Sequence, residues 1–137
     1  GLKYIHNNRI VHNDIKDSNL VLFKGGIIKY IDFDLCLYLP KYYSLNYFYN
    51  KLWINDSKRG GTIVFMSPEE LIPGYKYNAK CDIYSLGITL YYIITGKNPF
   101  LFPYDNPKNI NKIMQIELRS MNKIDWNDDI WTKFEYG

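Results

Sequence analysis

The chain has 137 residues, the size of one domain, and 47% of them are hydrophobic while 23% are charged. That balance excludes disordered and low-complexity classes and predicts a folded core. The net charge is only +3 and the lysines are scattered, so the basic patch of a nucleic-acid-binding protein is missing. We therefore expect one globular unit that does not bind nucleic acid.

The two cysteines and the apolar segments indicate the compartment. Cys36 and Cys81 stand far apart, with no histidine or second cysteine at a metal-binding spacing, which favours reduced thiols in an intracellular, cytoplasmic protein. The most apolar stretch, Ile83 to Thr95, is too short to span a membrane, so we expect no membrane contact. The chain starts at Gly1 rather than Met, so we expect it to be a fragment of a longer protein or a processed product.

The first forty residues predict a helix end and a hairpin. Leu2 to His6 has the character of the last turns of a helix. Two β-prone runs, Leu20 to Phe23 and Ile27 to Ile31, surround a Lys-Gly-Gly turn and predict a β-hairpin. The polar segments 14–19 and 32–34 flank this hairpin at its open ends, so we expect them to lie side by side.

The rest of the chain is predicted to be helical after one long loop. Residues 35–62 show no clean period and read as loop. Ser67 to Glu70 predicts a short helix with proline at its first position. Asp82 is the expected N-cap of an apolar helix from Ile83 to Thr95 that is buried on all sides, and Asn109 to Met121 predicts a last amphipathic helix.

Four chemical groups are expected at the hairpin's open end: Asp14, Lys16, Asn19 and Asp32. Phosphoryl transfer depends on positioning and on cations that compensate the phosphate charge, so two carboxylates, an amide and an ammonium suit it. Oxygen atoms of Asn19 and Asp32 suit Mg²⁺. In this hypothesis Asp14 accepts the proton of the attacking hydroxyl and Lys16 reaches the γ-phosphate of ATP.

Four motifs in order resemble those of the protein kinase family. His-Asn-Asp-Ile-Lys-x-x-Asn at 12–19 resembles the catalytic loop, and Asp-Phe-Asp at 32–34 resembles Asp-Phe-Gly. Residues 61–69, with Gly-Thr and Ser-Pro-Glu, resemble the end of the activation segment, and 82–87 resemble the start of the central helix. The resemblance implies an α+β fold, namely the mainly helical C-terminal lobe of a kinase with a small hairpin, with residues 1–137 as a partial kinase domain that lacks the N-lobe.

The resemblance also implies roles for single residues. Lys16 and Thr62 are similar to residues of the serine/threonine branch, which uses ATP and Mg²⁺ to phosphorylate proteins. In that branch Thr62 would contact Asp14 and the substrate. The arginine that pairs with Glu69 in the family would lie past the C-terminus, so we expect no such partner within the chain. Structural support is implied for four residues: His12, Phe33, Glu69 and Asp82.

Two positions depart from the family pattern. Asn13 replaces the arginine that clamps an activation-segment phosphate, and a neutral amide cannot make that charged contact. We therefore expect activity without obligatory phosphorylation of this segment. Asp34 replaces the permissive glycine of Asp-Phe-Gly and adds a carboxylate near the expected metal.

Two alternatives stay open at this point. The chain could be a catalytically silent pseudokinase or C-lobe remnant that serves as an interaction module, because nothing in it resembles the Gly-rich loop or the lysine-bearing strand of the N-lobe. A remote alternative is a small-molecule kinase of the choline or aminoglycoside type, whose sequences lack the motifs at 67–69 and 82–87. In either case we expect the isolated chain to be inactive and to need the N-lobe or a partner over its exposed apolar surface.

Overall fold

The structure is a computed structural model that describes residues 1–40, 44, 46–47, 54, 60–72, 74–100, 111 and 119. The described residues contain helices and two separate two-stranded antiparallel sheets, in agreement with an α+β class. In chain order the elements are α1 (Leu2–Asn7), β1 (Ile10–Val11), the 3₁₀ turn η1 (Asp17–Asn19), β2 (Leu20–Phe23), β3 (Ile27–Tyr30), β4 (Leu37–Tyr38), α3 (Pro68–Leu71) and α4 (Lys80–Thr95).

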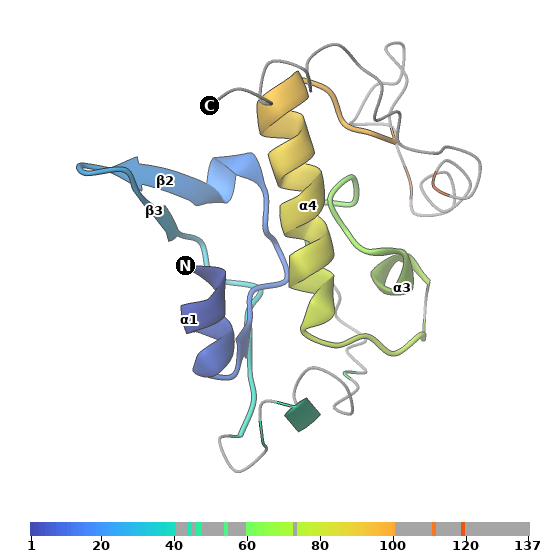
Figure 1. Cartoon of the computed structure of the whole chain (residues 1–137). Helices are drawn as coiled ribbons and strands as arrows, with labels where there is room; N and C mark the ends of the chain where they lie inside the picture. The colour runs from blue at the N-terminus through green and yellow to red at the C-terminus, as the bar shows by residue number, and fades with distance from the viewer. Residues whose placement is uncertain are drawn as a thin grey trace.

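Helix α4 lies between the other elements, with α1 and the hairpin on one side and α3 on the other (Figure 1). It ends at Gly96, whose φ of 70° gives the left-handed C-cap for which glycine is suited. The prediction that Asp82 caps this helix was wrong, because the N-cap is Ala79 and Asp82 lies in the first turn. The helix is also less enclosed than predicted, since Ile83 and Ile93 are about half exposed.

Strands β2 and β3 form the predicted hairpin, in a register that runs from Leu20 opposite Tyr30 to Phe23 opposite Ile27. Its turn has positive φ at both Gly25 and Gly26, which a tight hairpin connection requires. Beyond the ladder the Ile31 amide donates to the Asn19 carbonyl at 3.0 Å. The two polar segments that flank the hairpin therefore meet at its open end.

A second pair of strands joins β1 to β4, and β4 lies in the segment 35–62 that was predicted to be loop. Ile10 pairs with Tyr38 and Val11 with Leu37. Two-residue strands have no visible period, and the partners are more than twenty positions apart, so the sequence pattern could not show them. Of the predicted helix at 109–121 only Asn111 and the helical Arg119 are among the described residues.

Two apolar clusters support these elements. One joins Val11 to Cys81 at the start of α4, and the other joins Phe65 to Ile88 further along the helix. Cys36 and Cys81 are both free thiols in the structure. Within the part of the chain that the structure describes, no helix is both long and apolar enough to cross a membrane.

Candidate active site

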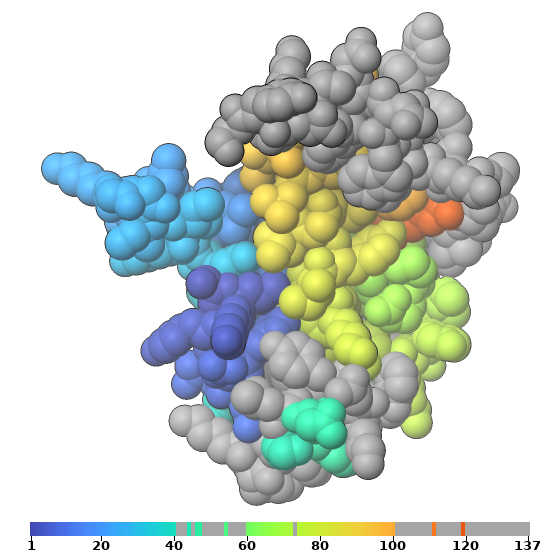
Figure 2. Space-filling view, viewed as in Figure 1, coloured from blue at the N-terminus to red at the C-terminus, as the bar shows by residue number. Residues whose placement is uncertain are grey.

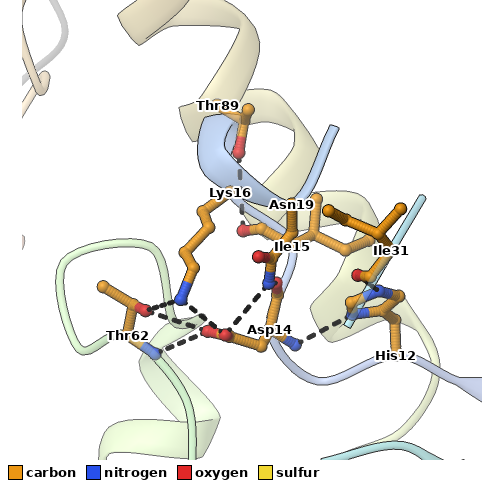
Figure 3. A network of polar contacts seen from close by, with 8 residues as sticks. All are labelled: His12, Asp14, Ile15, Lys16, Asn19, Ile31, Thr62 and Thr89. Carbon is orange, nitrogen blue, oxygen red and sulfur yellow. Dashed lines mark hydrogen bonds and ion pairs between the residues drawn. The ribbon is translucent and has the colours of Figure 1, made fainter. Parts of the chain in front are cut away.

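The carboxylate of Asp14 is the centre of a polar network in the loop of residues 12–19, the 12–19 loop below (Figure 3). Lys16 Nζ donates to Asp14 Oδ2 at 2.7 Å and to Thr62 Oγ1 at 3.0 Å. The backbone amide and hydroxyl of Thr62 both donate to Asp14 Oδ1 at 2.9 Å. Asn19 Nδ2 donates to Asp14 O at 2.8 Å and to Oδ2 at 3.1 Å. Lys16, Asn19 and Thr62, all proposed from the sequence, therefore converge on Asp14.

These contacts determine the charge state of Asp14, which is almost fully buried. Burial by itself raises the pKa of a carboxyl, but the hydrogen bonds from Lys16 and Thr62 and the charge of Lys16 outweigh it and hold the Asp14 pKa below its usual value. Asp14 is consequently a carboxylate at neutral pH, able to accept a proton from a group brought against it.

Gly61 brings Thr62 to this carboxylate. Its φ is 122°, a backbone conformation that residues with a Cβ atom rarely adopt. A Cβ built on Gly61 would lie 2.8 Å from the backbone oxygen of Asn13. The close approach of this segment to the 12–19 loop therefore requires glycine at this position.

Asp82 binds the start of the 12–19 loop from helix α4. Its Oδ2 accepts from the backbone amide of His12 at 2.8 Å, and its Oδ1 accepts from the amide of Asn13 at 2.9 Å. His6 Nε2 is also 2.8 Å from Oδ2. Asp82 is 1% exposed, and three donors compensate its buried charge. Asp82 therefore connects helix α4 to the backbone of the 12–19 loop.

His12 connects the loop to the hairpin in a defined tautomer. Its Nε2 is 3.1 Å from the Ile31 carbonyl, which can only accept, so Nε2 carries the proton. Its Nδ1 then accepts from the Asp14 amide at 3.4 Å. The ring also packs on Phe33 with centroids 4.8 Å apart. His12 and Phe33, two of the four residues named as support, thus lie against one another.

Asn19 and Asp32 are the candidates for holding a metal ion. Asn19 is buried and uses its amide nitrogen on Asp14, which leaves its oxygen as the atom that could bind a cation. Asp32 is exposed, with a φ of 64°. Asp34, which replaces glycine, does not have a positive φ, so the replacement costs no backbone strain. Among the described residues no three His, Cys, Asp or Glu side chains gather as a metal site.

Thr89 is a supporting residue that sequence analysis missed. Its hydroxyl donates to the Ser85 carbonyl at 2.7 Å and lies 3.5 Å from the Ile15 carbonyl of the 12–19 loop. Asp82, Ser85 and Thr89 are all buried, and their spacing of three and four residues puts them on one face of α4. A polar stripe at helical spacing inside an apolar helix was the signal that could have identified this face.

Glu70, rather than Glu69, is the buried acid of the short helix α3. The backbone amide and hydroxyl of Ser67 both donate to Glu70 Oε2 at 2.8 Å, while Glu69 is half-buried. Burial raises the pKa of Glu70 to about 7, against the two hydrogen bonds from Ser67 and with a further increase from Asp82 and Glu69. The Ser-x-x-Glu spacing of a capping box was the available signal.

Arg119 lies against the segment between Thr62 and α3. Its guanidinium donates to the carbonyls of Met66, Val64 and Ile63. The central guanidinium carbon, Cζ, lies 5.3 Å from the ring centroid of Tyr84. Burial lowers the Arg119 pKa, and the Tyr84 phenol and the carboxylates of Glu70 and Glu69 oppose that shift. Arg119 therefore binds carbonyls of the segment 63–66, and its charge also acts on the two acids of α3.

A buried carboxylate that is kept ionised can accept a proton from an alcohol, and the ammonium beside it can stabilise negative charge. The chain belongs to the protein kinase family, since the sequence profile of the protein kinase domain matches residues 1–135. That family assignment confirms the resemblance found in the four motifs.

Individual relatives agree with this assignment. The chain is 36% identical over 104 residues to the serine/threonine-protein kinase SKM1 of Saccharomyces cerevisiae, covering 74% of this chain and 14% of that protein. It is 36% identical over 100 residues to sperm motility kinase 2B of Mus musculus, covering 73% and 18%. Mitogen-activated protein kinase kinase kinase 1b of Physcomitrium patens is 35% identical over 100 residues, covering 73% and 12%. The chain thus spans less than a fifth of the length of these relatives.

A solved structure has the same fold. A chain of the yeast RNA Pol II CTD kinase CTDK-1 complex superposes with a TM-score of 0.65 over 86% of this chain and 33% of that one, at 24% identity. The kinase-like fold is therefore found by structural as well as sequence comparison.

Proposed function

We propose that this chain is the C-terminal lobe of a serine/threonine protein kinase, and that residues 1–137 are part of a kinase domain whose N-terminal lobe lies elsewhere in a longer protein. The observation that carries the proposal is the convergence of Lys16 and Thr62 on the buried carboxylate of Asp14, in a chain that belongs to the protein kinase family.

In the proposed reaction the hydroxyl oxygen of a serine or threonine in a protein substrate attacks the γ-phosphorus of ATP. The hydroxyl proton passes to Asp14, the bond from the γ-phosphorus to the β–γ bridging oxygen breaks, and ADP leaves. The lowered pKa keeps Asp14 ionised and ready to accept. Lys16, whose Nζ lies 2.7 Å from Asp14 Oδ2, would compensate charge on the transferring phosphoryl group.

Asn19 and Asp32 would hold Mg²⁺, and their amide and carboxylate oxygens are ligands that this hard cation prefers. The ion would supply positive charge to the phosphates of ATP. Asn19 is kept in place for this role by its two hydrogen bonds to Asp14.

Two features support the proposed specificity for serine and threonine. Thr62 lies beside Asp14 in the segment expected to line the substrate site, and its hydroxyl links Asp14 to Lys16. Relatives from yeast bear the name serine/threonine-protein kinase.

The apolar surfaces support a covering partner, which we propose is the N-terminal lobe. A hollow of about 670 Å³ lies between α1 and β3, and its lining includes Tyr4, Ile28, Tyr30 and Phe33. Phe33 is exposed there although its ring touches the buried His12. Because the isolated chain lacks this covering lobe, we expect it to be inactive. We expect the intact protein to act inside the cell, where ATP is available.

The test is to supply ATP, Mg²⁺ and a library of serine, threonine and tyrosine peptides to the intact protein and to follow phosphopeptides by mass spectrometry. The proposal predicts phosphorylated serine or threonine. Phosphorylation of choline or an aminoglycoside in a parallel reaction would favour a small-molecule kinase. Absence of both, together with absent nucleotide binding, would identify a silent interaction module.

A further inference from the structure

Asn13, which replaces the phosphate-clamping arginine of the family, lies where the β1–β4 ladder ends. The register that pairs Ile10 with Tyr38 and Val11 with Leu37 would, if continued, put Asn13 opposite Leu35. The backbone cannot continue this ladder, because Asn13 has a φ of 65° and its backbone N–H donates to Asp82 Oδ1 at 2.9 Å. The ladder therefore loses its next backbone donor at this position.

The side chain of Asn13 supplies the missing contact. Its Nδ2 donates to the carbonyl oxygen of Leu35 at 2.9 Å, at the position that the continued register would give to a backbone amide. Asparagine is also among the residues that best tolerate a positive φ. One residue type thus satisfies both the backbone turn and the side-chain link.

The other end of the amide is used as well. Cys81 Sγ, at the start of α4, lies 3.9 Å from Asn13 Oδ1 in donor geometry. Burial raises the pKa of the Cys81 thiol well above its ordinary value, so it stays a thiol and can donate. The amide therefore bridges α4 and the segment that follows residues 32–34, and the two contacts agree on its orientation.

We propose that Asn13 is a positioning residue that holds the segment after Asp32, Phe33 and Asp34 against the 12–19 loop through uncharged hydrogen bonds. This inference rests on the proposed kinase function. Leu35 directly follows the segment that contains the metal-binding candidate Asp32, so fixing its carbonyl limits where Asp32 can lie. The link needs no phosphate, because both of its partners are neutral.

The direct test is hydrogen exchange of the amides from Leu35 to Leu39 in the intact protein. Asn13→Gly keeps the positive φ and deletes the amide, and we expect exchange in this segment to rise about fivefold, as for the loss of one neutral hydrogen bond. Asn8→Gly is the matched control, since Asn8 Nδ2 also donates to a carbonyl, that of Tyr4, at 2.9 Å. Equal exchange in Asn13→Gly and wild type would overturn the proposal.

Activity supplies the second readout. Asn13→Asp is almost isosteric but turns an oxygen toward the Leu35 carbonyl, so we expect kcat to fall about tenfold while the KM for peptide stays within about twofold. Wild type should keep its rate after phosphatase treatment, and a large loss would contradict the inference. If the wild-type protein phosphorylates nothing, the proposed function fails. The hydrogen-exchange comparison still decides the role of Asn13 in that case. If Asn13→Gly does not fold, Asn13→Asp takes its place in that comparison.

Discussion

The 12–19 loop and the β2–β3 hairpin follow one another in the chain but are built in opposite ways. In the loop, buried polar groups find partners within the chain: Asp14 accepts from Lys16 and Thr62, and Asp82 accepts from two backbone amides. The hairpin instead stands out from the body (Figure 2) and exposes much of its apolar surface, with Leu22 at 71%. The comparison separates a region whose buried polar groups are paired within the chain from a region whose apolar side chains stay exposed.

The largest effect on stability is expected at the base of the loop. In the wild type the Asp82 carboxylate accepts from the backbone amides of His12 and Asn13. Asp82→Asn places an amide nitrogen against one of these donors and removes the charge, so the free energy of unfolding should fall by about 3 kcal/mol. Urea unfolding of the intact protein measures it, with Asp34→Asn, an exposed acid, as the control. A decrease no larger than that of the control would show that the loop does not depend on Asp82.

An intermediate effect is expected at Glu70 and depends on pH. Its pKa is about 7 in the folded protein, above the ordinary 4.5, so the folded state binds the proton more tightly and stability falls as pH rises from about 4.5 to 7. Glu70→Gln keeps an oxygen for Ser67 without a charge. Between about pH 5.5 and 8, wild type should lose about 2 kcal/mol relative to this variant.

Unfolding measured across this pH range provides the test, with Glu69→Gln on the half-buried neighbouring acid as the control. If the free energy of unfolding changes with pH in the same way for wild type and Glu70→Gln, Glu70 is already ionised in the folded protein across this range. The structure would then tolerate a buried charge at Glu70.

The smallest effect is expected on the hairpin. Leu22→Thr changes a side chain that is 71% exposed, so the free energy of unfolding should change by less than about 0.5 kcal/mol. Val11→Thr places the same hydroxyl in a fully buried site and should cost about 1–3 kcal/mol. A cost of Leu22→Thr as large as that of Val11→Thr would show that the Leu22 side chain is buried in the intact protein, and would contradict this prediction.

The sequence predicted the elements whose signals are local. The Gly-Gly turn identified the hairpin, Ser-Pro-Glu-Glu the helix α3, and the apolar run the helix α4. It also named Asp14, Lys16, Asn19 and Asp32 as one site, and the family resemblance added Thr62. The contacts in the structure join Lys16, Asn19 and Thr62 to Asp14.

The rest depended on contacts between distant residues. Strand β4 is two residues long and exists only because β1 pairs with it. Asp82 was misread as a helix cap because its carboxylate serves a loop 69 positions away, which no local propensity shows. Arg119 reaches carbonyls more than fifty residues earlier, so its position follows from the fold and not from its neighbours in sequence.

The most direct test of the account is the phosphorylation rate of Asp14→Asn compared with Asp17→Asn in the intact protein. The first variant removes the buried proton acceptor, and the second changes an exposed acid three positions along the same loop. The account predicts that Asp14→Asn lowers kcat by about 10²- to 10⁴-fold while Asp17→Asn keeps the wild-type rate. An Asp14→Asn protein that stays folded and phosphorylates peptide at the wild-type rate would contradict the central role of this carboxylate.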